Sequence, residues 1–143
     1  MSNLNTMRGV QLTGHGGPDA LVYRADIPVP SPGKSEVLIK VGAAGVNNTD
    51  INTRVGWYSK GEGDAEDAGW GGQALSFPRI QGADICGMVV AVGTGADKGL
   101  IKKRVLVEPC LWEANGKSLA SPWYMGSECD GGFAEYVTVA ARH

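Results

Sequence analysis

Polar side chains that could bind and orient a small molecule lie between positions 47 and 58. Asn47 has a carboxamide that donates and accepts hydrogen bonds, Asp50 has a carboxylate, and Tyr58 offers a neutral hydroxyl. These groups could hold a substrate or cofactor in place. They also have a plainer interpretation, in which Asn47 satisfies its own backbone in a turn and Asp50 favourably charges the first turn of a short helix. The residues alone leave both interpretations open.

Metal chemistry is a second candidate, and the residue types argue against it. Zinc takes thiolate, imidazole or carboxylate ligands, usually three plus a water in a catalytic site. Cys110 and Cys129 lie 19 residues apart and cannot supply four ligands, even if His143 added a third. We therefore expect no zinc. Cys86, which lies in an apolar run, is predicted to be a small buried side chain.

Length and composition narrow the class of protein. A chain of 143 residues predicts one domain, and a net charge of −2 gives no electrostatic footprint for nucleic acid or for an anionic membrane. No apolar run approaches the ~20 residues that span a bilayer, and the first residues do not resemble a secretory signal. Three cysteines do not form a disulfide framework, so we expect a reducing cytoplasm.

The elements that must position these residues are mostly short strands. The 22 glycines and 7 prolines suit tight turns between strands. The run 85–92 is almost entirely apolar, which predicts a strand buried on both faces. Asn48 or Thr49 could cap a short helix that ends near Arg54. The pattern predicts an all-β barrel or sandwich, with strands near 10–12, 21–25, 36–46, 85–92, 104–107 and 133–139.

Three glycine-rich segments are interpreted as turns or loops. Gly93-Thr94-Gly95 lacks the third glycine and the helix of a dinucleotide-binding motif, so we predict a turn. Residues 14–18 predict a hairpin turn with a solvated His15. Residues 59–76 are acidic and contain Trp70; they are either a solvated surface loop or a lid over a substrate cleft.

Two segments resemble the medium-chain dehydrogenase/reductase family. They are residues 82–93, Gly-Ala-Asp-Ile-Cys-Gly-Met-Val-Val-Ala-Val-Gly, and residues 43–50, Ala-Ala-Gly-Val-Asn-Asn-Thr-Asp. The zinc-dependent alcohol dehydrogenases of that family have a zinc-binding His where this chain has Ala83, and a zinc-binding Cys where it has Asn47. The zinc-independent quinone oxidoreductases instead share Asn47, Asp50 and Tyr58 with this chain. The similarity extends from Met7 to Val137.

This resemblance implies a mainly β fold, a GroES-like partly open barrel with one or two short helices, over residues 1–143. It implies that Asn47 and Tyr58 are catalytic, and that Asn47, Asp50 and Tyr58 bind the cofactor near its nicotinamide and ribose. No residue is expected to bind metal. Asp84 occupies the position of a family Glu, and we expect it to bond to nearby backbone or to an arginine.

The resemblance also implies a partner that is not in this sequence. Family members carry a Rossmann domain that binds NAD(P)H, and no glycine-rich βαβ unit follows here. We therefore expect a substrate-side domain that is inactive alone and has a bare apolar face where the missing Rossmann domain docks. That face could form a homo-oligomer.

The expected reaction is NAD(P)H-dependent reduction of a small-molecule substrate, a quinone, enone or similar carbonyl compound. Two alternatives remain open. The first is a zinc-type alcohol dehydrogenase domain with degenerate metal ligands. The second is a free-standing β-barrel interaction module.

Overall fold

The computed structural model describes residues 5–60, 69 and 74–143. Most of the loop at 59–76, including Trp70, lies outside these ranges, so the surface-loop and lid interpretations both remain predictions. Among the described residues, every helix is too short or too polar to cross a bilayer.

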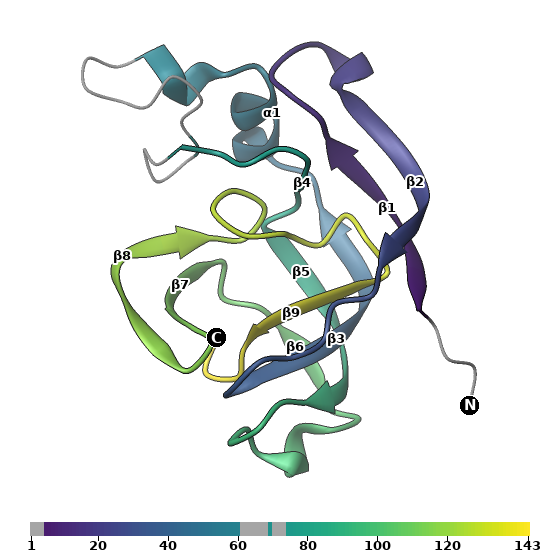
Figure 1. The fold of residues 1–143 in the computed structure, drawn as a ribbon, viewed down its shortest axis with the longest axis vertical. Helices are drawn as coiled ribbons and strands as arrows, with labels where there is room; N and C mark the ends of the chain where they lie inside the picture. Colours follow the sequence, from purple (N-terminus) through teal and green to yellow (C-terminus); the bar gives the residue numbers. More distant parts are fainter. Residues whose placement is uncertain (1–4, 61–68, 70–73) are drawn as a thin grey trace.

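A four-stranded antiparallel sheet forms the centre of the molecule (Figure 1). Its order is β6 (Arg104–Leu106), β5 (Asp84–Val92), β3 (Glu36–Gly45) and β9 (Tyr136–Ala140). The two longest strands, β3 and β5, are rich in valine and isoleucine, which favour extended backbone. They pair along their whole length and so form the frame on which the other elements rest.

Two smaller sheets flank this frame on opposite sides in Figure 1. One has the order β2 (Leu21–Pro28), β1 (Thr6–Leu12) and β4 (Arg79–Ile80). The other is a hairpin of β7 (Cys110–Ala114) and β8 (Lys117–Tyr124). Within the described ranges the three sheets do not join into one closed ring. The predicted fold, mainly β and partly open, is therefore confirmed.

The helical elements are few and short. α1 (Asn48–Arg54) is the α-helix of the described residues, and Figure 1 shows it at one end of the molecule. The 3₁₀ turns are η1 (Pro18–Ala20), η2 (Trp57–Lys60) and η3 (Lys98–Leu100). Gly93 to Gly95 form a turn before η3, as predicted.

Alternation along the strands places one face of the central sheet in the core. The main cluster is apolar and comes from four strands and the segments between them; it contains Val37, Ile39, Ile85, Val89, Val107, Leu111, Met125, Val137 and Val139. A second cluster of Met7, Ile27 and Ile80 lies under the β2-β1-β4 sheet. Each buried aliphatic side chain of this kind stabilises the fold by roughly 1.5–3 kcal/mol.

The other face of β5 is open, so the prediction of burial on both faces was wrong. Met88 is 42% exposed and Val90 is 39% exposed, whereas Ile85 and Val89 are buried. Cys86 is half-buried instead of fully buried. An apolar run had suggested two covered faces, but no described element packs over this one.

The β7–β8 hairpin was not predicted, although the sequence contains a signal for it. Asn115 and Gly116 form the two-residue turn, and both have positive φ, 52° and 68°. That is the backbone of a type I′ hairpin turn, which Asn-Gly favours strongly. β9 also begins later than predicted, because Phe133 donates its N–H to the Gln81 carbonyl before the strand starts.

Gly87 provides a test of the central frame. It lies beside the bulge in β3, and a Cβ placed there would meet the Lys40 carbonyl oxygen and come within 2.6 Å of Ile39 Cγ2. We expect Gly87→Ala to lower the free energy of unfolding by about 1–3 kcal/mol, because backbone must move to accept the methyl group.

Chemical denaturation of both variants and the parent chain measures this difference. Gly14→Ala is the matched control, since a Cβ at Gly14 meets nothing within 4 Å. Equal stability of the two variants would show that the β3–β5 pairing adjusts without cost.

Candidate functional site

Asn47 forms the start of α1. Its backbone is extended, with φ −136° and ψ 178°, and its Oδ1 accepts the Thr49 N–H at 2.8 Å. In return, the Asn47 N–H donates to Asp50 Oδ2 at 3.0 Å, which completes a capping box. The predicted helix is therefore present, but its cap is Asn47 and not Asn48 or Thr49.

Asp50 joins α1 to a segment 32 residues further along the chain. Its side chain is buried, and its Oδ1 accepts the Gly82 N–H at 3.1 Å. The Asp50 carbonyl accepts from Gln81 Nε2 at 2.9 Å. Burial raises the pKa of Asp50, with a smaller contribution from the nearby Asp84 charge, while the two backbone N–H groups oppose the rise.

Asp84 lies beside Asn47 at the first position of β5. Asn47 Nδ2 donates to Asp84 Oδ2 at 2.8 Å. Asp84 thus bonds to a side-chain amide, and the expectation of a backbone or arginine partner was wrong. Gly45 pairs with Asp84 across the sheet, and its lack of a side chain leaves room for the carboxylate.

Tyr58 follows α1 in the next element. It lies in η2, half-buried, with its ring in an edge-to-face contact with Trp57 at 5.2 Å between centroids. The described residues provide no hydrogen-bond partner for its hydroxyl. The structure thus brings together three of the polar groups, Asn47, Asp50 and Asp84, and places Tyr58 in η2, after the end of α1.

His15 contributes to the site, and its predicted solvation was wrong. It is half-buried, and its Nδ1 lies 2.8 Å from the Thr53 carbonyl, so Nδ1 carries the hydrogen. Nearby, Arg54 and Gly16 bond twice through their backbone and the Arg54 guanidinium. The bonds from His15 and Gly16 satisfy the backbone carbonyls of Thr53 and Arg54 at the end of α1. The partners are 38 residues apart, so the sequence carries no local signal for the contact.

The surface around these polar groups is apolar. Val46 is 72% exposed and Trp57 is 55% exposed, and Ile51 and Val55 are each 45% exposed. Large apolar side chains held in solvent next to fixed polar groups are typical of binding surfaces. The arrangement suits a small molecule with an apolar body and a hydrogen-bonding end.

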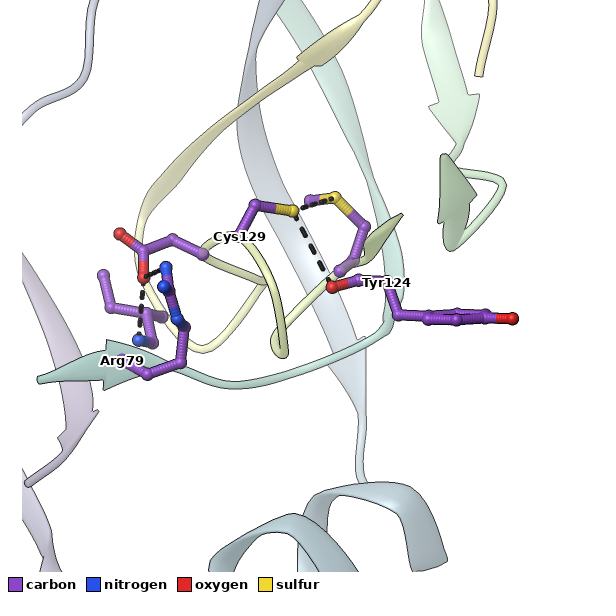
Figure 2. A network of polar contacts seen from close by, with 6 residues as sticks. Arg79, Tyr124 and Cys129 are labelled. Atoms are coloured by element: carbon purple, nitrogen blue, oxygen red, sulfur yellow. Dashed lines mark hydrogen bonds and ion pairs between the residues drawn. The ribbon is translucent and has the colours of Figure 1, made fainter. Parts of the chain in front are cut away.

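The described residues contain no group of three or more side chains that could hold a metal ion. Ala83 is buried and apolar. Figure 2 shows the Cys129 thiol directed at the Tyr124 carbonyl and the Met125 sulfur, both at 3.7 Å. Burial raises the pKa of Cys129 to about 12, so this thiol stays protonated and is a poor metal ligand.

The nearby Arg79 has a structural role in the same network. Figure 2 shows its guanidinium bonded to Asp130, at 3.0 Å, and the same carboxylate oxygen accepts the Ile80 N–H. The contact fixes β4, which leads directly into the Gln81–Gly82 segment that Asp50 binds.

The open β fold with a capped helix at one end matches a known class. The model of the alcohol dehydrogenase GroES-like domain matches residues 33–143. The chain therefore belongs to this family, an oxidoreductase domain of the medium-chain dehydrogenase/reductase type. The matched range includes Asn47, Asp50, Tyr58 and Asp84.

Relatives of two kinds are similar to the chain. Human quinone oxidoreductase is 33% identical over 137 residues, covering 96% of this chain and 32% of that protein. An NAD-dependent alcohol dehydrogenase of Sulfurisphaera tokodaii is 35% identical over 146 residues, covering 93% and 38%. The crystal structure of a proposed alcohol dehydrogenase from Sinorhizobium meliloti 1021 has a TM-score of 0.79 at 46% identity, covering 96% and 39%. The chain thus spans about a third of its curated relatives' length.

The raised pKa of Asp50 gives a titration test. The folded chain binds more protons than the unfolded chain between the usual Asp pKa and the raised value, so Asp50's contribution to stability falls as pH rises through that window. Asp84→Asn should move the pKa of Asp50 part of the way down, because burial, the larger cause, is unchanged.

Carbon-detected NMR of the Asp50 carboxyl across pH measures this midpoint. Asp97→Asn is the control, because Asp97 caps η3 and does not contact Asp50. A midpoint at or below that of an unperturbed aspartate would contradict the burial argument.

Proposed function

We propose that this chain is the substrate-side domain of an NAD(P)H-dependent oxidoreductase that reduces a quinone, an enone or a similar carbonyl compound. The observation that supports this most directly is the fixed Asn47 carboxamide. It stands where the zinc-type members of the family place a thiolate, and Ala83 stands where they place a histidine. The site therefore offers neutral hydrogen bonds, and the proposal includes no zinc.

Asn47 and Tyr58 are the proposed catalytic residues. Each can donate a hydrogen bond to a carbonyl oxygen or to the nicotinamide end of the cofactor. NAD(P)H, when bound, supplies the hydride. The exposed apolar side chains around α1 are suited to the body of a ring-shaped substrate.

Asp50 is proposed to assist cofactor binding through Asn47. Its carboxylate is buried, and both of its oxygens accept backbone N–H groups. A ligand therefore meets Asn47 and Tyr58 first. Asp50 holds the helix start in the orientation that presents them.

The proposed alternative within enzymes is an alcohol dehydrogenase domain whose metal ligands have changed, since one relative is an alcohol dehydrogenase. A change from thiolate to carboxamide removes charge and metal affinity together. The observed amide therefore favours the zinc-independent reaction. A free-standing interaction module would need neither the fixed Asn47 amide nor Tyr58.

Kinetics of two variants test the function. In the longer polypeptide that we propose carries this domain, Asn47→Ala and Tyr58→Phe should each lower kcat/KM for NAD(P)H-dependent quinone reduction by roughly 5- to 150-fold, because each loses one polar contact to a reacting group.

Tyr23→Phe is the matched control, because Tyr23 is 63% exposed on β2, outside the site. Full activity in the Asn47 and Tyr58 variants, together with a lowered Tm, would assign both residues to the fold and reject the proposed site.

We also propose where a Rossmann domain docks on this chain. A groove of about 1040 Å³ crosses the open face of β3, β5 and β6, lined by Lys40, Gly42, Cys86, Met88, Arg104 and Leu106. Leu106 is 83% exposed. Surfaces between domains bury ~600–1,500 Å², and this face of the central sheet carries exposed apolar side chains, among them Met88 and Leu106. The NAD(P)-binding partner covers it in this proposal.

A bare face of this kind should self-associate. We expect sedimentation of the 143-residue chain to show concentration-dependent association, and Leu106→Asp to reduce it, because a charge on the groove opposes apolar burial. Tyr23→Ser, which removes an exposed aromatic residue elsewhere, should leave association unchanged. A strict monomer at high concentration would count against this docking face.

A further inference from the structure

The Asn47 carboxamide is held at both of its ends. Oδ1 accepts the Thr49 N–H at 2.8 Å and also the Thr49 hydroxyl. Nδ2 donates to Asp84 Oδ2 at 2.8 Å. One contact comes from the start of α1, and the other comes from β5, 37 residues further along the chain than Asn47.

These contacts allow one orientation of the amide. A 180° flip would place the NH₂ group against the Thr49 N–H, so that two donors would face each other. It would also place the amide oxygen against the Asp84 carboxylate, so that two acceptors would face each other. Both bonds would be lost, and like groups would face each other in their place.

The register of the central sheet sets the position of Asp84. It pairs with Gly45, two residues before Asn47, and a Cβ on Gly45 would lie 3.1 Å from Asp84 Cβ. The bulge in β3 between Val41 and Ala43 shifts the pairing by one residue and brings Asp84 level with Gly45. The carboxylate is thus delivered to Asn47 by rigid strands instead of by a loop.

One N–H of the amide remains to meet a ligand. A carboxamide nitrogen has two N–H groups in one plane, and Asp84 accepts one of them. The direction of the second follows from the first. The described residues supply no acceptor for it, and the bond to a carboxylate, being charge-assisted, holds the group more firmly than a neutral partner would.

We propose that Asp84 is a positioning residue that aims the free N–H of Asn47 at the carbonyl oxygen of the substrate. This inference rests on the proposed function of Asn47, and it adds a residue that the zinc-independent chemistry requires. Asp84 itself does not contact the substrate. Thr49 holds the oxygen end of the same amide.

NMR of the 143-residue chain tests the positioning without any measurement of activity. The order parameter of Asn47 Nδ2 should be near ~0.8 in the parent chain and fall below ~0.6 in Asp84→Ala, the value of a flexible group. Asp84→Asn should restore most of the order, because its carbonyl oxygen can still accept the hydrogen bond. Asp97→Ala, which removes a carboxylate remote from Asn47, is the control, and backbone amide spectra verify the fold of every variant.

An order parameter that stays high in Asp84→Ala would overturn the proposal, because Thr49 alone would then fix the amide. The proposal would also be overturned if the Asn47 side chain were as mobile in Asp84→Asn as in Asp84→Ala.

A second arm separates this proposal from the proposed function. Cyclohexanone, a ketone that does not alkylate cysteine, is titrated into the parent chain and into Asp84→Ala. A shift of the Asn47 side-chain signal that is lost in Asp84→Ala supports both proposals. An ordered Asn47 that depends on Asp84 but does not respond to cyclohexanone supports the positioning and counts against the carbonyl site.

Discussion

The candidate site depends on the buried carboxylate of Asp50. A carboxylate out of water is costly unless hydrogen bonds compensate it, and here two backbone N–H groups do so, those of Asn47 and Gly82. The first belongs to the start of α1 and the second to the segment between β4 and β5. One side chain therefore fixes the helix on the central sheet. Without it, the capped turn that presents Asn47 would lose its bond to the segment that leads into β5, where Asp84 lies.

The segment that Asp50 binds is itself held on its other side. Gly131 and Gly132 donate their N–H groups to the Ile80 and Gly82 carbonyls. These backbones pass so closely that a Cβ on Gly131 would overlap the Gly82 carbonyl oxygen. Glycine is therefore required where these two backbone segments approach each other. The polar cluster is supported by these close backbone contacts between distant parts of the sequence. Loops that carry function need a rigid support of this kind.

The strands of the frame could be predicted from the sequence, because their valine and isoleucine runs are long and local. The capped helix was predicted to within a residue or two for the same reason, since Asn, Thr and Asp near a helix start act over a single turn. The hairpin around Asn115-Gly116 was not predicted, although its two-residue turn carries a local sequence signal. The contacts of His15 with Thr53 and of Asn47 with Asp84 could not be predicted, because they span 38 and 37 residues and depend on strand register. The open face of β5 was missed since an apolar run does not reveal which of its faces is covered within the same chain.

On the proposed function, the exchange of metal ligands for a carboxamide changes what controls the reaction. A zinc ion would polarise a carbonyl by its charge. Its thiolate and imidazole ligands titrate, so zinc binding would depend on pH. An amide donor carries no net charge and does not titrate, so its contribution depends on the direction of its N–H group and not on protonation. Two carboxylates set that direction here, Asp84 through the Asn47 Nδ2 atom and Asp50 through the Asn47 backbone. Because Asp50 is buried and its pKa is raised, its protonation in acid would weaken the backbone contact before the amide itself were altered. Any pH dependence that Asn47 brings to catalysis must therefore come from its neighbours, through geometry.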